Sequence, residues 1–194
     1  MNYLERDTIA TIGRAKKILD NDFSKTNTHI LIAMWNSLQT AIEDMFIILL
    51  AKRSIREDIA EFDIPRRWKR DLVDETEEDN YRFFLSSWRT GGDHIVDYME
   101  RKLSCFDMGG DVSEELTTGL IEMHALRNCL VHRASIADKK CTEQAPSLNL
   151  SVGQEIFIDR KMLTKYYKVA GEYAKLLLGR VTKCKYLVVI PKTE

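Results

Sequence analysis

The chain has 194 residues, and its 29 Lys and Arg residues nearly balance its 30 Asp and Glu residues, so the formal net charge is −1 at pH 7. Hydrophobic residues make up 44% of the chain and charged residues 30%, a composition typical of a folded globular domain. This balance excludes a strongly basic protein that coats nucleic acid, but it leaves room for a small basic site. The length suits one domain, so we expect a single domain over residues 1–194.

Neither a secretory signal nor a membrane span is predicted. Residues 1–22 are polar and charged and lack the apolar core of a signal peptide. The most apolar run, residues 45–51, is far shorter than the about 20 residues that cross a bilayer. We therefore expect a cytoplasmic protein with no membrane partner. Its 4 cysteines include no C-x-x-C pair and are expected to stay reduced.

Apolar residues recur at the three- and four-residue spacing of a helix over most of the chain. The expected helices cover residues 7–19, about 27–53, about 65–72, 77–90, 94–106, about 113–137 and 160–181. Asp93 and Asp159 are the expected N-caps of two of them. The last helix is expected to pack Tyr166, Tyr167 and Tyr173 into the core.

One stretch near the C-terminal end has a different pattern. Apolar and polar residues alternate over residues 148–152, Gly153 interrupts them, and residues 156–158 are again apolar. This pattern predicts a small β-hairpin over about 148–158, before the last helix. A final strand is expected at residues 186–190. The predicted fold class is therefore all-α, a helical bundle with a β-hairpin near its C-terminal end.

The most informative segment is the predicted helix around Arg127. On a helical wheel an apolar stripe forms, and Arg127 lies near its middle. The residues of the stripe are Leu116, Leu120, Met123, Leu126, Leu130 and Val131. A guanidinium in this position has to pair with a carboxylate, bond to backbone carbonyls or face a polar cleft, because burying an unpaired charge is very costly.

Asn128 and His132 lie beside this stripe on one face, since residues four apart on a helix are neighbours. With Arg127 they offer a permanent cation, an amide and an imidazole that titrates near neutral pH. RNA cleavage without a metal needs a base that takes the proton of the ribose 2′-hydroxyl and a cation that holds the phosphate. We expect His132 to act as a general acid or base, and Arg127 to bind a phosphate through two of its guanidinium nitrogens. Asn128 would hold the imidazole or a phosphate oxygen.

Residues 127–132, with the sequence RNCLVH, resemble the R-x4-H signature of HEPN domains (higher eukaryotes and prokaryotes nucleotide-binding). The resemblance of the motif covers residues 122–139, and that of the helical bundle extends over most of the chain. It implies a metal-independent endoribonuclease without a cofactor, of a toxin, abortive-infection or antiviral-defence type, that leaves a 2′,3′-cyclic phosphate. It implies a homodimer in which two motifs form one composite site, and an antitoxin or other defence-system partner protein. Carried over by position, Arg127 and His132 are catalytic and Asn128 supports them.

Two positions depart from members of this family. In toxins paired with a nucleotidyltransferase antitoxin, a tyrosine commonly lies two residues after the histidine, whereas this chain has Ala134 there. Many relatives also carry a glycine shortly after the histidine, which residues 133–136 lack. Three interpretations stay open. The chain is a ribonuclease, a catalytically silent HEPN-like binding or assembly module that partners another protein, or a structural protein in which Arg127 and His132 tie helices together.

Several other residues are candidates for supporting roles. Glu43, in the long apolar helix, either orients Arg127 or pairs locally. His124 lies near the motif on the wheel and has either a secondary or a structural role. A basic cluster around Trp68 either holds an RNA backbone or forms a solvated helix face. The RNA-binding candidates are Arg66, Arg67, Lys69 and Arg70, together with Arg133. The chain has no P-loop, dinucleotide-binding, zinc-protease or hydrolase motif, and no metal site is expected.

Overall fold

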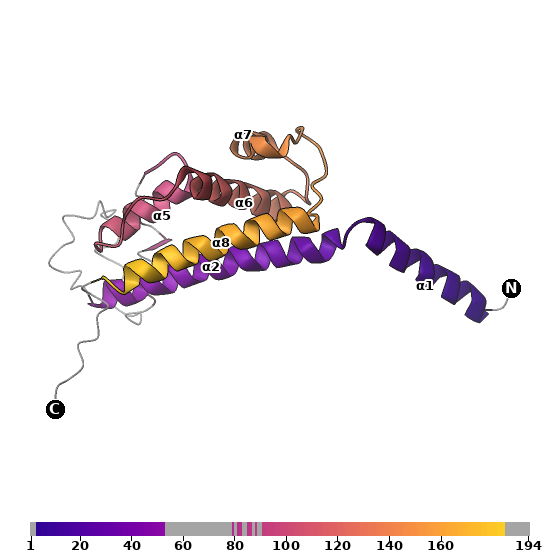
Figure 1. Ribbon diagram of the computed structural model, residues 1–194, viewed down its shortest axis with the longest axis horizontal. Coiled ribbons are helices and arrows are strands. Elements are labelled where there is room, and N and C mark those ends of the chain that lie inside the picture. The colour runs from indigo at the N-terminus through magenta and orange to yellow at the C-terminus, as the bar shows by residue number, and fades with distance from the viewer. Residues whose placement is uncertain are drawn as a thin grey trace, which may run out of the picture. The chain divides into compact units, whose positions relative to one another are not determined.

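A computed structural model of the chain describes residues 3–52, 79, 81–82, 85–86, 88 and 91–184 (Figure 1). These residues form helices and loops, and no strand occurs among them, so the expected all-α class is confirmed for this part of the chain. The elements are α1 (Tyr3–Asp20), α2 (Ser24–Lys52), α5 (Ile95–Ser104), α6 (Glu114–His132), α7 (Lys139–Gln144), the short 3-10 helix η2 (Pro146–Leu148) and α8 (Arg160–Val181). None of the described helices is long and apolar enough to span a bilayer.

The chain divides into two compact units, each built from two separate stretches of sequence. The first unit contains residues 1–35 and 122–170, and the second contains residues 36–121 and 171–194. The helices α2, α6 and α8 each contribute residues to both units. The motif at residues 127–132 belongs to the first unit.

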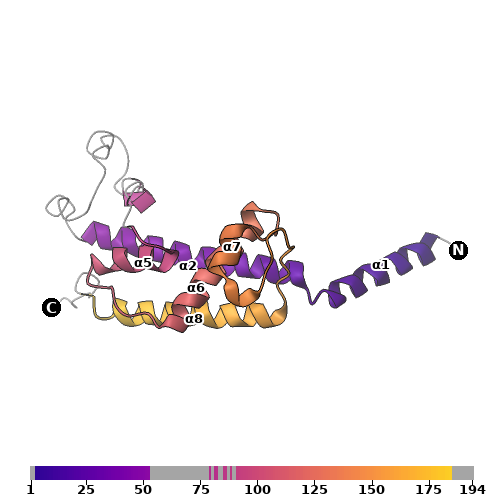
Figure 2. The same ribbon diagram turned by 90° about the horizontal axis from the view of Figure 1, so that it is seen from above.

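In the first unit, the beginning of α2 is fastened to the residues that precede α8. The Asn27 side chain donates hydrogen bonds to the carbonyl oxygens of Asp22 (2.8 Å) and Ile158 (3.0 Å), and the Ser24 hydroxyl accepts one from the Ile158 amide (3.1 Å). Ser24 and Asn27 are themselves buried, so these bonds satisfy polar groups that would otherwise lose water without compensation. The end of α6 runs steeply across the direction of these two helices (Figure 2).

The core of the first unit gathers around the end of α6 and the beginning of α8. Its fully covered side chains include an aromatic ring from α8 and three apolar side chains from α2 and α6: Tyr166, Leu31, Met123 and Leu126. The expectation that three tyrosines of α8 pack inward is wrong for one of them, because Tyr167 is 69% exposed. Successive helical residues are rotated by about 100°, so Tyr166 and Tyr167 cannot both face the same core.

The loop between α6 and α8 departs from the expected hairpin. Residues 148–158 form no strand pair with one another, only a turn in which the Gln154 amide donates to the Ser151 carbonyl oxygen (3.0 Å). Instead residues 153–156 pair with 135–137 through a single antiparallel bridge, Ile136 to Glu155, and through the flanking bonds from Ala137 to Gln154 and from Ile156 to Ser135. Pro146–Leu148 form a 3-10 turn, and Asn149 adopts a left-handed φ of 50°, which breaks any extended run. Val152, one of the alternating apolar residues, is 65% exposed, so it does not pack against an apolar surface as a hairpin strand would require.

The helix that carries the motif ends earlier than expected, at His132. Ala134 and Ser135 have φ values of 50° and 64°, outside the range of a right-handed helix. A short helix that was not predicted, α7, then begins at its N-cap Asp138, whose carboxylate accepts from the Cys141 amide (2.8 Å). The Cys129 thiol of α6 also contacts this carboxylate, at 3.8 Å, so one acidic side chain joins the two helices.

The second unit has its own aromatic core and its own half-buried ion pair. The rings of Phe46, Trp88 and Phe106 pack together, with centroids 6.0 to 6.5 Å apart. Glu100 accepts hydrogen bonds from the Tyr173 hydroxyl (2.9 Å) and from the Arg180 guanidinium (2.8 Å). These bonds link α5 to the later part of α8 inside this unit.

Two expected helix caps have different outcomes. Asp159 caps α8 as predicted, because its carboxylate accepts from the Met162 amide (2.7 Å). The prediction for α5 is wrong by one residue, since the N-cap is His94 rather than Asp93: the His94 ring accepts from the Asp97 amide (3.3 Å). A neutral imidazole nitrogen is an acceptor and can replace the carboxylate in this role. The helix expected at about 65–72 and the strand expected at 186–190 lie outside the described residues, as does most of the helix expected at 77–90.

Candidate functional site

Arg127, Asn128 and His132 come together at the end of α6, within the first unit. One guanidinium nitrogen of Arg127, Nη1, lies 3.1 Å from Asn128 Oδ1 and 3.3 Å from His132 Nε2. His132 is exposed, whereas Arg127 and Asn128 are half-buried. Arg127 therefore contacts both of the other residues predicted to form the site, at a place that solvent reaches.

The cluster extends inward to a second histidine. Asn128 Nδ2 lies 3.1 Å from His124 Nε2, one helical turn earlier in α6. The His124 ring in turn packs against the buried Trp35 of α2, with the ring centroids 5.1 Å apart. The polar contacts thus run in a continuous line from the covered Trp35–His124 pair to the exposed His132.

The chemistry of Arg127 fixes the hydrogen-bonding role of every group in this line. A guanidinium only donates, so Asn128 Oδ1 and His132 Nε2 are both acceptors. Asn128 then presents its amide NH₂ to His124, whose Nε2 must accept as well. Both Nε2 atoms therefore act as hydrogen-bond acceptors in this arrangement.

The electrostatic surroundings of His124 favour a neutral ring. Burial of the ring, with smaller contributions from the positive charges of Lys140 and Arg127, lowers the pKa of His124 from 6.5 to about 4. At neutral pH His124 is an uncharged acceptor that holds Asn128 in place. The sequence feature that pointed to His124 was its four-residue spacing from Asn128, because residues four apart lie on one helix face.

The apolar stripe of α6 is covered along most of its length but opens at the last turn. Its residues are buried from Leu116 to Leu130, but Val131 is 43% exposed, contrary to the expectation that it packs inward. Val131 lies four residues after Arg127 and so on the same side of the helix. This side of the last turn is open, which explains how a guanidinium placed in an apolar stripe still reaches solvent.

The end of α6 also borders a hollow in the first unit. Leu130 and Ser135, on either side of His132 in sequence, help line a space of about 650 Å³. Its other walls come from the end of α1, the beginning of α2 and residues 155–157. This groove is large enough for a segment of another molecule, and Arg127, Asn128 and His132 are not among its lining residues.

Arg133, predicted to bind RNA, is exposed and makes one ion pair. Its Nε lies 3.4 Å from a carboxylate oxygen of Asp138. Hydrogen bonding from the Cys141 amide, with a smaller contribution from Arg133, lowers the pKa of Asp138. Because the Arg133 side chain is 64% exposed, the pairing leaves it accessible to a phosphate.

The other predicted site residues lie in the second unit or outside the described residues. Glu43 belongs to the second unit, where it is exposed and accepts a hydrogen bond from Gln39 at 2.9 Å, one turn earlier in α2. The basic residues Arg66, Arg67, Lys69 and Arg70 lie outside the described residues. Within the described ranges, no group of three or more His, Cys, Asp or Glu side chains is placed to hold a metal ion.

Comparison of the chain with family models, with curated proteins and with solved structures gave no match. Any functional assignment therefore depends on the side chains themselves and on the sequence resemblance described above.

Proposed function

We propose that the chain is a HEPN-like helical domain that acts as a metal-independent endoribonuclease of a toxin or antiviral-defence type. The observation that carries this proposal is the contact of Arg127 with both Asn128 and His132 at the exposed end of α6. Arg127 contacts its sequence neighbour Asn128 and also His132, five residues further along the RNCLVH motif, and the imidazole of His132 is accessible.

The proposed reaction uses each side chain according to its chemistry. His132 takes the proton from a ribose 2′-hydroxyl, and the 2′-oxygen then attacks the adjacent phosphorus. The bond from phosphorus to the 5′-oxygen breaks, that oxygen takes up a proton, and a 2′,3′-cyclic phosphate remains. Arg127 holds the phosphate oxygens as negative charge builds up on them. Asn128 keeps the guanidinium in position and acts without touching the reacting atoms.

Substrate binding would also release the base. In the structure without RNA, His132 Nε2 accepts from Arg127 at 3.3 Å. A phosphate is a stronger acceptor for a guanidinium than a neutral imidazole, because both partners are charged. Transfer of Arg127 to the phosphate would leave His132 Nε2 free to accept the 2′-hydroxyl proton.

The proposal includes a homodimer with the two motifs facing each other. A two-fold interface needs apolar surface near its centre. The described residues around the site provide some, because Val131, Ile136 and Phe157 are 43%, 38% and 55% exposed. An antitoxin or defence partner would compete for the same surface or cover it.

The same contact supports a second candidate, a catalytically silent HEPN-like module that binds a partner protein. If Arg127 stays on His132 Nε2, the nitrogen needed as a base is occupied. In that case the exposed apolar residues around His132 would serve assembly rather than catalysis.

A ribonuclease assay in EDTA separates these candidates. The wild type is compared with His132→Ala and Arg127→Ala on single-stranded and structured RNAs, with circular dichroism to confirm folding. We expect cleavage that survives chelation and falls at least about 100-fold in each variant, the usual effect of losing an acid–base group. Cleavage that persists in both variants would overturn the site assignment. A folded, dimeric wild type without activity on any RNA would favour the silent module.

A further inference from the structure

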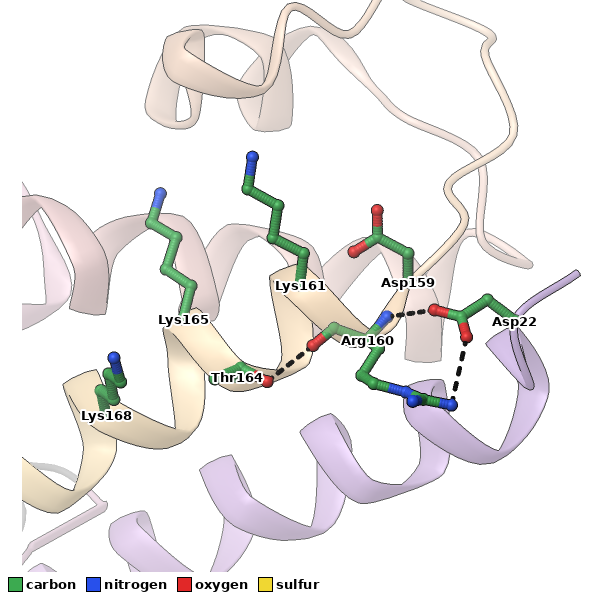
Figure 3. A pocket seen from close by; sticks show the side chains of 7 residues that line it. All are labelled: Asp22, Asp159, Arg160, Lys161, Thr164, Lys165 and Lys168. Atoms are coloured by element: carbon green, nitrogen blue, oxygen red, sulfur yellow. Dashed lines mark hydrogen bonds and ion pairs between the residues drawn. The ribbon is translucent and has the colours of Figure 1, made fainter.

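The first three turns of α8 carry a row of positive side chains. Arg160, Lys161, Lys165 and Lys168 line a shallow hollow of about 600 Å³, together with Asp22, Asp159 and Thr164 (Figure 3). All the lining residues of α8 are exposed. The hollow lies entirely in the first unit, the one that holds the RNCLVH motif.

The acidic residues of this hollow are already engaged at one end of the row. Asp159 accepts from the Met162 amide (2.7 Å), and Asp22 accepts from the Arg160 amide (2.7 Å) while pairing with the Arg160 guanidinium (3.6 Å). Two amides of the first helical turn are therefore satisfied by carboxylates. The beginning of α8 offers no place for an isolated anion, and the charge of Arg160 is offset by Asp22.

The three lysines further along are different. Lys161, Lys165 and Lys168 are spaced by four and three residues, so they lie on one side of the helix. In Figure 3 the side chains of Lys161 and Lys165 extend away from α8 in the same direction. Lys165 donates to the buried Glu122 (2.6 Å), but within the described ranges no carboxylate lies within ion-pair distance of Lys161 or Lys168. Two positive charges on this face are thus uncompensated on a chain whose net charge is −1.

An exposed aromatic ring lies on the same turns of α8, on the side of the helix beyond Thr164 from the lysines. Tyr167 is 69% exposed and follows Thr164, which lines the hollow, by three residues, so the two are neighbours on the helix surface. A solvent-facing tyrosine beside aligned cations suits a ligand that has both phosphates and flat rings. A small anion would need a compact set of donors, whereas a row of long, separate side chains suits a linear polyanion.

We propose that Lys161 and Lys168 bind phosphates of a single-stranded RNA and that Tyr167 stacks on one of its bases, while Lys165 stays on Glu122. This face of α8 is then a second RNA contact outside the RNCLVH motif. The proposal rests on the function proposed above, because it supplies a binding surface for the same class of substrate. It accounts for how a chain without net positive charge retains a polyanionic substrate.

The test measures binding separately from cleavage. The full-length chain with His132→Ala, which prevents turnover, is titrated into a fluorescently labelled single-stranded RNA at several KCl concentrations. The same background then carries Lys161→Gln with Lys168→Gln, two exposed positions. Lys165 is left intact because it bonds to the buried Glu122. The control is Lys16→Gln, an exposed lysine of α1 outside the hollow.

We expect the double variant to bind RNA about tenfold more weakly at 0.1 M KCl. The logarithm of the association constant falls linearly with the logarithm of the salt concentration. This slope should become shallower by about 1.4, because each phosphate contact on a single strand contributes about 0.7. Tyr167→Ala should weaken binding further without changing the slope, and the Lys16 control should match the parent.

Unchanged RNA affinity and salt slope in the double variant would overturn this inference. Loss of binding to anionic lipid vesicles with unchanged RNA binding would also overturn it, and would point to a membrane surface instead. RNA binding that depends on the lysines in a wild type that never cleaves RNA would support this inference while contradicting the enzymatic function.

Discussion

Arg127 has only hydrogen-bond donors, and this property sets the roles of the side chains around it. Asn128 must turn its oxygen toward Arg127 and its NH₂ toward His124, and both histidines must accept at Nε2. The half-buried, neutral imidazole of His124 therefore holds Asn128 in place at the inner end of the cluster, and the exposed imidazole of His132 lies at its outer end. The two histidines differ in burial, which is why we propose an acid–base role for His132 and a positioning role for His124.

The lowered pKa of His124 predicts a specific loss of stability in acid. The folded-state pKa is about 4 and the ordinary value is 6.5, so as the pH falls the unfolded chain binds the proton first. The free energy of unfolding should be unaffected by His124 above about pH 7 and should decline between about pH 6.5 and pH 4. The contribution of His124 should be roughly 2 to 3 kcal/mol, allowing for the partial exposure of the ring.

Urea unfolding of the wild type and of His124→Gln at pH 7.5, 6.0 and 5.0 checks this. Glutamine can still accept from Asn128 but does not titrate, so the difference between the two proteins should shrink or change sign toward pH 5. Parallel pH profiles for both proteins would contradict the assigned burial of His124.

At the scale of elements, Glu122 joins α6, η2 and the first half of α8. Its carboxylate is fully buried and accepts hydrogen bonds from Ser147, from Lys165 (2.6 Å) and from the Tyr166 hydroxyl (3.3 Å). Burial, with the adjacent negative charge of Glu122, raises the pKa of Tyr166, so the phenol stays a donor at all physiological pH values. A buried acid with three donors fixes the position of α8 against α6 inside the first unit.

Removal of this carboxylate should cost far more than removal of a surface one. Glu122→Ala would leave Lys165 and the buried Tyr166 hydroxyl without their acceptor, and we expect a loss of about 2 to 3 kcal/mol in the free energy of unfolding. Glu122→Gln, which keeps one oxygen acceptor, should lose less. The matched control is Glu143→Ala, which breaks the exposed Lys139–Glu143 pair (3.7 Å) and should change stability by under about 0.5 kcal/mol. Equal losses in the Glu122→Ala and Glu143→Ala variants in urea unfolding would contradict the proposed role of Glu122.

At the scale of the whole molecule, the exposed apolar residues near His132 predict the oligomeric state. Val131 follows Arg127 by one turn and is 43% exposed, so a two-fold partner over the site would cover it. Val131→Glu would place a charge in that interface and should weaken self-association at least about tenfold, because an unpaired charge resists burial.

Sedimentation equilibrium of both proteins measures this change directly. Leu178→Glu is the control, since Leu178 is also exposed but belongs to the second unit and not to the one that carries the motif. We expect the control to associate like the wild type. A wild type that is monomeric at all concentrations would contradict the composite-site proposal.

A feature could be predicted when residues close together in sequence determine it. The helix of residues 160–181 was predicted at its observed bounds, since Asp159 caps it and its apolar residues recur every three or four positions. The contact among Arg127, Asn128 and His132 follows from positions within two turns of one helix. The hairpin was wrong because strand pairing needs a partner, and residues 153–156 found theirs at 135–137 rather than next to them.

Local spacing along the chain was enough to establish the helical class, the cap of α8 and the grouping of Arg127, Asn128 and His132 on one helix end, because helical hydrogen bonds and side-chain neighbours extend only three or four residues. Burial and charge compensation depend on residues far apart in sequence. The tertiary structure alone shows that His124 is covered by Trp35, that Glu122 receives Lys165 from 43 residues away, and that Tyr167 and Val131 face solvent. Those contacts decide which imidazole is held neutral and which lysines are left for a ligand, since only packing between distant segments removes water from some groups and leaves it on others.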